Sequence, residues 1–433
     1  MILSFALAVT IKAILDGDSG IWQGTPAGLA IFIFFLLMCI VGLMEGMQIA
    51  AFALVKLPDE QLKTYNFAYK SCTLMFSGQN FQAFLIGRQI FVACLMFIVA
   101  KIASLNMQDG HGNIFGVDDG FQGFLNTGLL GAVILTIIGS LAWRIVASSF
   151  PVAFMSNPLI YVIIRICLLI EASGICSSAW VLARWHKLLI NYQPDEVYLK
   201  GAPKHGAEPV TKRDKDVDIT VTLVKYLYSL ALLVFAICII MAVIFTNNTT
   251  IAKDVHPVFA FFLFWFFIVW LAMMEGGQGA LVGLQVVDPS KYKSTHPRTF
   301  RNTKLSHWGD NMERFILGRQ YLVVLIIFLI NQSGAPIDST VTVLNLPKIV
   351  TSIFLENGVA NMIVTIVIGQ LTSQVNAAVC MIDFLNNYFM LFTVYVSLLI
   401  EFTGLVHSVY LVQIFFSKIT GKPIESKEVC FSY

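Results

Sequence analysis

Four short stretches of this chain combine residue types that can form a polar binding site. Two of them are Glu45-Gly46-Met47-Gln48 and Glu275-Gly276-Gly277-Gln278, which stand 230 positions apart. The other two are Gly87-Arg88-Gln89 and Gly318-Arg319-Gln320, 231 positions apart. On a helix the glutamate and glutamine of E-G-x-Q share one face because they are three residues apart, and the glycine between them removes bulk beside that face. The pattern predicts one polar notch in each half of the chain.

Glutamate offers hydrogen-bond acceptors, glutamine offers both a donor and an acceptor, and arginine offers a fork of donors. A charge at the centre of a membrane helix costs about 2.5–3.5 kcal/mol, so Arg88 and Arg319 are the natural partners of Glu45 and Glu275, within one half or across the two. Such pairs either serve the structure alone or line a site, and their duplication favours a site. A compact, uncharged polyol or oxyacid suits this lining better than an anion, because each arginine already has a glutamate to neutralise it. The predicted substrate-binding residues are Glu45, Gln48, Arg88, Gln89, Glu275, Gln278, Arg319 and Gln320, with the motif glycines Gly46, Gly87, Gly276 and Gly318.

A second mirrored pair of acids, Glu171 and Glu401, lies inside apolar segments, and Asp383 adds a further carboxylate in the second half. Sodium prefers carboxylate and carbonyl oxygens, so these three are candidates for coupling an ion or a proton. The alternative is that the acids pair with Arg144 or Arg165, or face the lipid headgroups.

Several classes of function find no support in the sequence. The seven histidines have no metal-ligand spacing, and the eight cysteines form no CxxC pair, which favours free, packed thiols over a disulfide or a metal site. No nucleophile-base arrangement and no phosphate-binding glycine loop is present, so we expect neither catalysis nor a cofactor. The 28 basic and 26 acidic residues nearly cancel, which argues against nucleic acid.

The elements that must position these residues are membrane-spanning helices. The chain has 433 residues, of which 57% are hydrophobic and only 12% charged, far from the soluble average of about 25% charged. A spanning helix needs about 20 mostly apolar residues. Residues 2–15 fall short of that, whereas their counterpart at 223–246 is full length, so we expect the first helix to lack its beginning. The other apolar segments lie at 27–55, 81–101, 126–149, 158–190, 221–246, 257–287, 312–332, 348–380 and 386–417.

Matched islands at a nearly constant offset indicate a duplicated unit. Besides the two motifs, Leu168-Leu169-Ile170-Glu171 pairs with Leu398-Leu399-Ile400-Glu401. Five spans in each copy give an all-α polytopic membrane protein with about ten transmembrane helices, and an odd number per copy forces two inverted five-helix repeats. The glycines at 42–46 and 276–283 either break helices near the site or permit close packing. The predicted divisions are a first repeat at 1–190, a polar linker at 191–220, a second repeat at 221–417 and a short polar tail at 418–433.

The sidedness of the loops stays open at this stage. Basic residues concentrate in the linker and in the loop after the second E-G-x-Q segment, which positive-inside reasoning places in the cytoplasm. The N-x-S/T sequons at Asn247, Asn248 and Asn331 fall in two loops expected on the other side. With ten spans both termini then lie outside, whereas the lysines of the C-terminal tail and those at positions 56, 63 and 70 favour the opposite.

The doubled E-G-x-Q and G-R-Q set resembles the silicic acid transporter family of diatoms and related siliceous organisms, over essentially the whole chain except that family's long coiled-coil tail. The resemblance implies sodium-coupled uptake of orthosilicic acid across the plasma membrane, with both termini in the cytoplasm. Because a neutral solute gains nothing from the membrane potential, its accumulation requires a co-transported ion, and we expect a symporter that works by alternating access. It places the motif glutamates, glutamines and arginines at or near the substrate path. The expected partners are silicic acid, sodium ion and the lipid bilayer, and homo-oligomer formation stays open.

Two other readings fit the residues. A passive channel or uniporter for small neutral hydroxylated solutes also uses glutamine and arginine to line a constriction, but it shows no sodium dependence. A structural membrane protein would use the Glu-Arg pairs only to orient helices. In that case replacing Gln48 or Gln278 leaves transport intact, whereas replacing Glu45 impairs folding.

Overall fold

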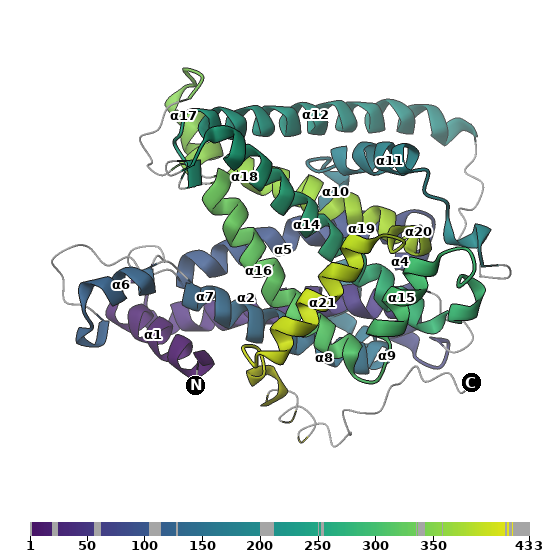
Figure 1. Cartoon of the computed structure of the whole chain (residues 1–433), viewed down its shortest axis with the longest axis horizontal. Coiled ribbons are helices and arrows are strands. Elements are labelled where there is room, and N and C mark those ends of the chain that lie inside the picture. The colour runs from purple at the N-terminus through teal and green to yellow at the C-terminus, as the bar shows by residue number, and fades with distance from the viewer. Residues whose placement is uncertain are drawn as a thin grey trace.

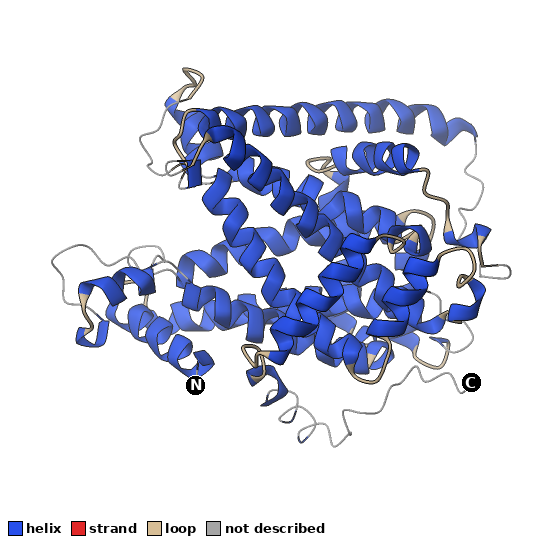
Figure 2. Ribbon diagram, in the orientation of Figure 1, coloured by secondary structure: helices blue, strands red, loops and turns tan. Residues whose placement is uncertain are grey.

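A computed structural model of the chain describes residues 2–19, 25–55, 62–103, 114–126, 129–199, 212–249, 251–252, 255–334, 336, 343–356, 358–411, 414 and 418. The described residues are almost entirely helical, and an isolated bridge joins Thr249 and Pro336 (Figures 1 and 2). Most of the expected tail at 418–433, and residues 200–211 of the expected linker, lie outside the described residues.

Three described helices are long and apolar enough to cross a membrane, at Ala27–Leu54, Thr220–Phe245 and Pro257–Val286. A fourth crossing is formed if the bent pair Lys348–Leu355 and Val359–Ala377 counts as one span, with an angle of 47° between its parts. Shorter apolar helices lie at Asn80–Met96, Val133–Ser149 and Tyr388–Phe402. The prediction of an all-α membrane protein is confirmed.

The helices that carry the motifs recur in the two halves with nearly the same bounds. Helix α2 (Ala27–Leu54) corresponds to α14 (Pro257–Gly283), and α5 (Asn80–Ala103) to α16 (Asn311–Gly334). Helix α10 (Pro158–Ala172) corresponds residue for residue to α21 (Tyr388–Phe402). An asparagine caps the start of both α10 and α21, because the side chains of Asn157 and Asn387 accept from backbone N–H groups of the first turn. Local capping signals were therefore duplicated along with the apolar pattern.

The fourth segment of each half is interrupted. In the first half α7 (Leu129–Thr136) passes through a π-helix η2 (Ile137–Leu141) into α8 (Ala142–Ser149), and α9 (Pro151–Met155) follows after a break. In the second half α18 (Val359–Val364) passes through π-helix η7 (Thr365–Leu371) into α19 (Thr372–Ala377), and α20 (Met381–Phe384) follows. Because π-turns inside helices often mark functional positions, this segment is a second place to look for site residues.

The glycines beside the motif glutamates do not break α2 or α14, which run through them unbroken. A Cβ atom on Gly46 would overlap the ring of Phe154, and one on Gly276 would overlap the ring of Phe384. These aromatic residues stand at the same offset as the glycines. Close packing, rather than helix breaking, is therefore the role of both glycines.

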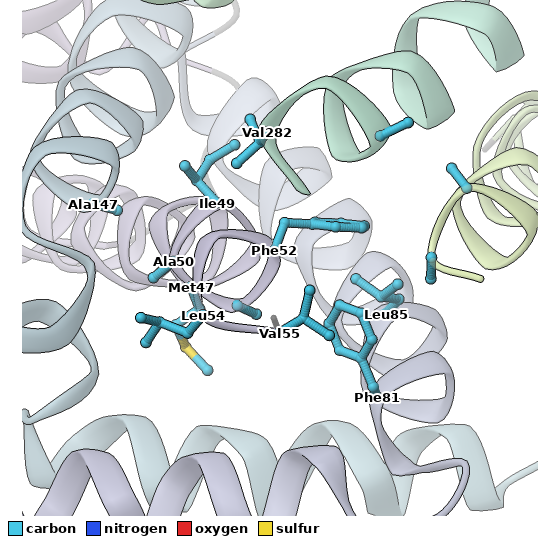
Figure 3. Close-up of a cluster of buried hydrophobic side chains, with 14 of the residues drawn as sticks. Met47, Ile49, Ala50, Phe52, Leu54, Val55, Phe81, Leu85, Ala147 and Val282 are labelled. Atoms are coloured by element: carbon cyan, nitrogen blue, oxygen red, sulfur yellow. The ribbon is translucent and has the colours of Figure 1, made fainter. Parts of the chain in front are cut away.

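The two halves interlock through their crossing helices. Helix α5 of the first half contacts η7 and α19 of the second, and α16 of the second half contacts α7 and η2 of the first (Figure 1). Helices α2 and α14 also pack on each other. Figure 3 shows the buried cluster at the end of α2, where Phe52 meets Phe81 of α5 at 5.3 Å between ring centroids and Val282 of α14 lies nearby. The motif residues thus lie where both halves meet.

The remaining elements cover these helices or connect them. Helix α12 is the longest, and its start at Lys212 lies inside the stretch expected to be linker. Asn331, expected in a loop, lies within α16. The other bounds are α1 (Ile2–Asp16), α4 (Asn66–Phe76), η1 (Ile114–Gly116), α6 (Asp119–Asn126), α11 (Ser178–Ile190), η3 (Asp195–Val197), α12 (Lys212–Phe245), η4 (Leu284–Val286), η5 (Pro289–Lys291), α15 (Pro297–Ser306), α17 (Lys348–Thr351) and η6 (Ser352–Glu356).

Candidate functional site

In the first half Glu45 receives two arginines. Arg88 Nη1 lies 3.2 Å from Glu45 Oε1, and Arg144 Nη2 donates to Glu45 Oε2. The three residues come from α2, α5 and α8, and each is buried. Because Arg144 binds both Glu45 and Gln278, whose Oε1 lies 2.6 Å from Arg144 Nη1, it links this half of the site to α14.

In the second half Glu275 receives one arginine and one amide. Arg319 Nη2 lies 2.6 Å from Glu275 Oε1, and Gln374 Nε2 donates to Glu275 Oε2 at 2.8 Å. Arg319 Nε also donates to the carbonyl oxygen of Met274 at 3.2 Å. The Glu-Arg pairs expected from the sequence are therefore confirmed. Of the two arrangements considered, within one half or across the two, the motif pairs form within each half.

Each motif arginine also holds the glutamine that follows it. Arg88 Nη2 donates to Gln89 Oε1 at 2.5 Å, and Arg319 Nη1 donates to Gln320 Oε1 at 2.9 Å. The amide of Gln89 then donates to Gln370 Oε1 of η7 at 2.7 Å, which is a second link between the halves. The eight predicted substrate-binding residues are all buried, and the ion pairs and these links join most of them with Arg144, Gln370 and Gln374 into a polar centre.

The described side chains of this centre carry more positive than negative charge. Arg88, Arg144 and Arg319 face only two carboxylates, those of Glu45 and Glu275. The expectation that Arg88 and Arg319 each have a glutamate is confirmed, but it did not include Arg144, which adds a third guanidinium without a third carboxylate. An excess guanidinium in a buried centre favours ligands that supply electron pairs, such as hydroxyl oxygens, and disfavours a cation at the same place.

Several buried polar atoms of the centre have no hydrogen-bond partner among the described residues. The acceptors are Gln48 Oε1 and Gln374 Oε1, and the donors are Gln278 Nε2, Arg88 Nε and Arg144 Nε. Leaving a buried donor or acceptor unpaired costs about 1–3 kcal/mol each, so a concentration of them is unusual for a purely structural core. A small hydroxylated molecule can satisfy donors and acceptors together.

Two glycines allow the arginine helices to approach their neighbours. Gly87 precedes Arg88 and lies against the backbone of α10, and Gly318 precedes Arg319 and lies against the backbone of α21. The absence of a side chain lets each crossing helix bring its arginine next to the glutamate. The G-R-Q motif is thus one unit in which the glycine sets the distance and the arginine makes the contact.

The three candidate ion-coupling acids lie apart from this centre in separate networks. Glu171 Oε1 accepts from the indole of Trp180 at 3.2 Å. Glu401 accepts from Arg314 at 2.7 Å, and also from His407 and Tyr410. Neither glutamate pairs with Arg144 or Arg165, since Arg144 binds Glu45 and Arg165 binds the hydroxyl of Tyr161, so that pairing was wrong. No group of three or more metal-binding side chains occurs among the described residues.

Asp383 of α20 binds residues of the segment that connects the two halves. Its carboxylate accepts from the backbone N–H of Gln193 at 2.5 Å and from Tyr198, and it lies 2.8 Å from His296 Nε2. Burial and the adjacent Asp383 carboxylate raise the pKa of Tyr198, so its hydroxyl stays protonated at neutral pH and donates. The structure thus gives Asp383 a role in docking the linker.

Arg144, Gln370 and Gln374 are the residues of the centre that the motif search did not find. Arg144 and Gln374 stand at the repeat offset of 230, and so do Ser140 and Gln370. Both pairs differ in residue type, so a search for identical residues passes over them. Their positions in the sequence could have indicated them, because polar side chains stand within an apolar segment at matched places in both halves.

Comparison with protein families gives two matches to one family model, described as silicon transporter, over residues 1–221 and 217–432. The two matches cover nearly the whole chain and divide it close to the start of α12. No curated protein and no solved structure matches the chain.

Proposed function

Since the chain belongs to the silicon transporter family, we propose that the polar centre between its halves is the site through which it takes up silicic acid, coupled to sodium, across the plasma membrane. Membership makes the chain a multi-pass membrane protein that transports silicon. The observation that supports this place for the site is the set of unpaired buried donors and acceptors around the two Glu-Arg pairs.

The chemistry of the substrate fits these atoms. Silicic acid is a small neutral molecule with four hydroxyl groups, and each hydroxyl both donates and accepts. Stripping it of water inside a membrane protein is unfavourable unless those hydrogen bonds are replaced. Gln48 Oε1 and Gln374 Oε1 can accept, while Gln278 Nε2 and the arginine Nε atoms can donate. Both kinds of partner are therefore present in one buried centre.

The links between the halves support an alternating-access mechanism. Arg144 with Gln278, and Gln89 with Gln370, are hydrogen bonds between the halves inside the centre. If the halves are inverted repeats that rock against each other, these are the contacts that break and re-form as the centre opens to either side. Both links involve the interrupted fourth segment, which is suited to local rearrangement.

Accumulation of a neutral substrate requires a co-transported ion, and we propose sodium for it because the family resemblance implies sodium. A neutral solute gains nothing from the membrane potential, whereas one sodium ion moving inward contributes about 2.3 kcal/mol per 100 mV. The excess positive charge of the centre disfavours a sodium ion there. We therefore place the coupling ion elsewhere, with Glu171, Glu401 and Asp383 as the candidates from the sequence. Of these, Glu171 has the fewest hydrogen-bond donors among the described residues.

The test is uptake of silicic acid, or of its analogue germanic acid, into sealed proteoliposomes with and without an inward sodium gradient. We expect accumulation that disappears when potassium replaces sodium, and a raised KM for Gln278→Ala with unchanged insertion. Equal equilibration in both salts would mean a passive channel or uniporter. An unchanged KM in Gln278→Ala would remove the polar centre from the substrate path.

A further inference from the structure

The two halves of the polar centre differ at one matched pair of positions. Arg144 in α8 and Gln374 in α19 stand 230 residues apart, and each donates to the glutamate of its own half. Arg144 makes a second bond, to Gln278 of the opposite half, at 2.6 Å. The matching bond would join Gln374 to Gln48, and it is not made: the Oε1 atoms of both lack a partner among the described residues.

This difference fixes the orientation of the Gln278 amide, that is, whether its oxygen or its nitrogen is directed toward Arg144. The oxygen and nitrogen of an amide occupy nearly equal positions, so the neighbouring groups determine its orientation. Arginine has donors and no acceptor, so the oxygen of Gln278 must face Arg144. The amide nitrogen then points away, and Nε2 is buried without a partner among the described residues. Gln278 is thereby fixed as a donor.

Gln48, the counterpart of Gln278, has no such constraint. Its side-chain oxygen accepts no hydrogen bond from the described residues, although only 1% of the residue is exposed. The equivalent of Arg144 is Gln374, which is engaged with Glu275 through its nitrogen and leaves only an oxygen unpaired. The centre therefore combines one fixed donor with unpaired acceptors on Gln48 and Gln374.

We propose that Arg144 is a specificity-determining positioning residue, which acts through Gln278 by holding its amide as a hydrogen-bond donor toward a hydroxyl oxygen of the substrate. This inference rests on the proposed function of the polar centre. A hydroxyl group that accepts from Gln278 can at the same time donate its one hydrogen to an unpaired acceptor, and a second hydroxyl group can donate to the other. The centre so defined selects a molecule with several hydroxyl groups over one that only accepts or only donates.

A double-mutant cycle on KM for silicic acid uptake tests this. Arg144→Gln copies the residue type that the second half already carries at this place, so the substituted side chain can bind Glu45 as Gln374 binds Glu275. It leaves the Gln278 amide free to turn, and we expect KM to rise about tenfold, a larger factor than the change in kcat that loss of this link between the halves brings. In the Gln278→Ala background the same change should raise KM no further, because the residue through which Arg144 acts is gone.

Additive effects would overturn the proposal, since Arg144 would then act on the substrate directly or only through packing. An unchanged KM in Arg144→Gln together with a raised KM in Gln278→Ala would also overturn the proposal. That result would still support the proposed function of the polar centre. If Gln278→Ala itself changes nothing, the proposed function fails. Arg165→Gln, at an exposed arginine bonded to Tyr161, is the matched control and should keep the wild-type KM.

A second variant, Gln278→Glu, tests the proposal even if Arg144→Gln fails to fold. Gln278→Glu retains an oxygen for Arg144 but replaces the donor nitrogen by another acceptor. It also balances the excess guanidinium charge, so we expect a stable protein with KM raised about tenfold or more. A wild-type KM in Gln278→Glu would show that no donor is needed at this place and would overturn the proposal.

Discussion

Gly87 packs directly against the backbone of Cys167: a Cβ atom placed on the glycine would overlap the carbonyl oxygen of Cys167. The second half repeats the relationship between Gly318 and the carbonyl oxygen of Ser397. Backbone atoms cannot turn aside as a flexible side chain does, so each contact sets how closely an arginine helix approaches its neighbour.

Gly87→Ala should therefore push α5 away from α10 and separate Arg88 from Glu45. We expect a large loss of stability, of about 3 kcal/mol or more, because both overpacking and a weakened buried ion pair result. The measurement is the thermal unfolding temperature and the yield of monodisperse protein in detergent. Gly28→Ala is the control, since a Cβ there meets nothing within 4 Å. Equal stability of the two variants would contradict this account.

Replacing Glu45 should lower the free energy of unfolding more than replacing Glu275. Glu45→Gln leaves both Arg88 and Arg144 without a carboxylate, whereas Glu275→Gln removes the carboxylate of only one arginine, Arg319. Removing one partner of a buried ion pair costs about 3–5 kcal/mol, and the first variant disrupts two such pairs. Thermal unfolding of the two purified variants measures the difference. A greater loss in Glu275→Gln than in Glu45→Gln would show that the guanidinium count does not control stability.

Arg319→Lys should impair transport although it keeps the positive charge. Arg319 contacts the carbonyl of Met274, the carboxylate of Glu275 and the amide of Gln320 through three different nitrogens. A lysine ammonium is a single point and cannot reach all three in this planar arrangement. We expect a fall in kcat/KM of about tenfold or more in proteoliposome uptake. Arg298→Lys, at an exposed position, is the matched control and should leave uptake unchanged.

The sodium dependence of uptake should distinguish the mirrored acids. Glu401 is occupied by Arg314, His407 and Tyr410, so Glu401→Gln should lower the unfolding temperature and leave the sodium dependence as it is. Glu171 has one described donor, Trp180, and Glu171→Gln should raise the sodium concentration needed for half-maximal uptake. The reverse pattern would move the coupling role to Glu401.

The sequence was sufficient for the main features of the fold. Its apolar segments, its duplication and the pairing of Glu45 with Arg88 and Glu275 with Arg319 all follow from local pattern and the cost of buried charge. What it could not supply was the interior of the fourth segments. Arg144 lies in an apolar run and matches no identical residue. Its partners depend on how α8 packs against α2 and on the approach of Gln278 from α14, which local pattern does not encode.

The segment at 158–190 shows the same limit. It reads as one apolar run, but Gly174 adopts a positive φ of 84° and divides it into α10 and α11. Gly404 does the same after α21, with a φ of 81°. A glycine in a membrane helix is compatible with packing or with a turn, and only the surrounding contacts decide. Gly46 and Gly276 illustrate packing, whereas Gly174 and Gly404 illustrate the turn.

The reciprocal contacts of α5 and α16 have a consequence for how far the two halves can differ. Each crossing helix contacts the broken helix of the other half, which is the contact pattern of two identical subunits around a two-fold axis. In a symmetric dimer of half-length chains, any substitution would appear on both sides of this face at once. Because both halves here belong to one chain, each half can differ from the other. Arginine at 144 and glutamine at 374 are a difference that a symmetric dimer could not have acquired.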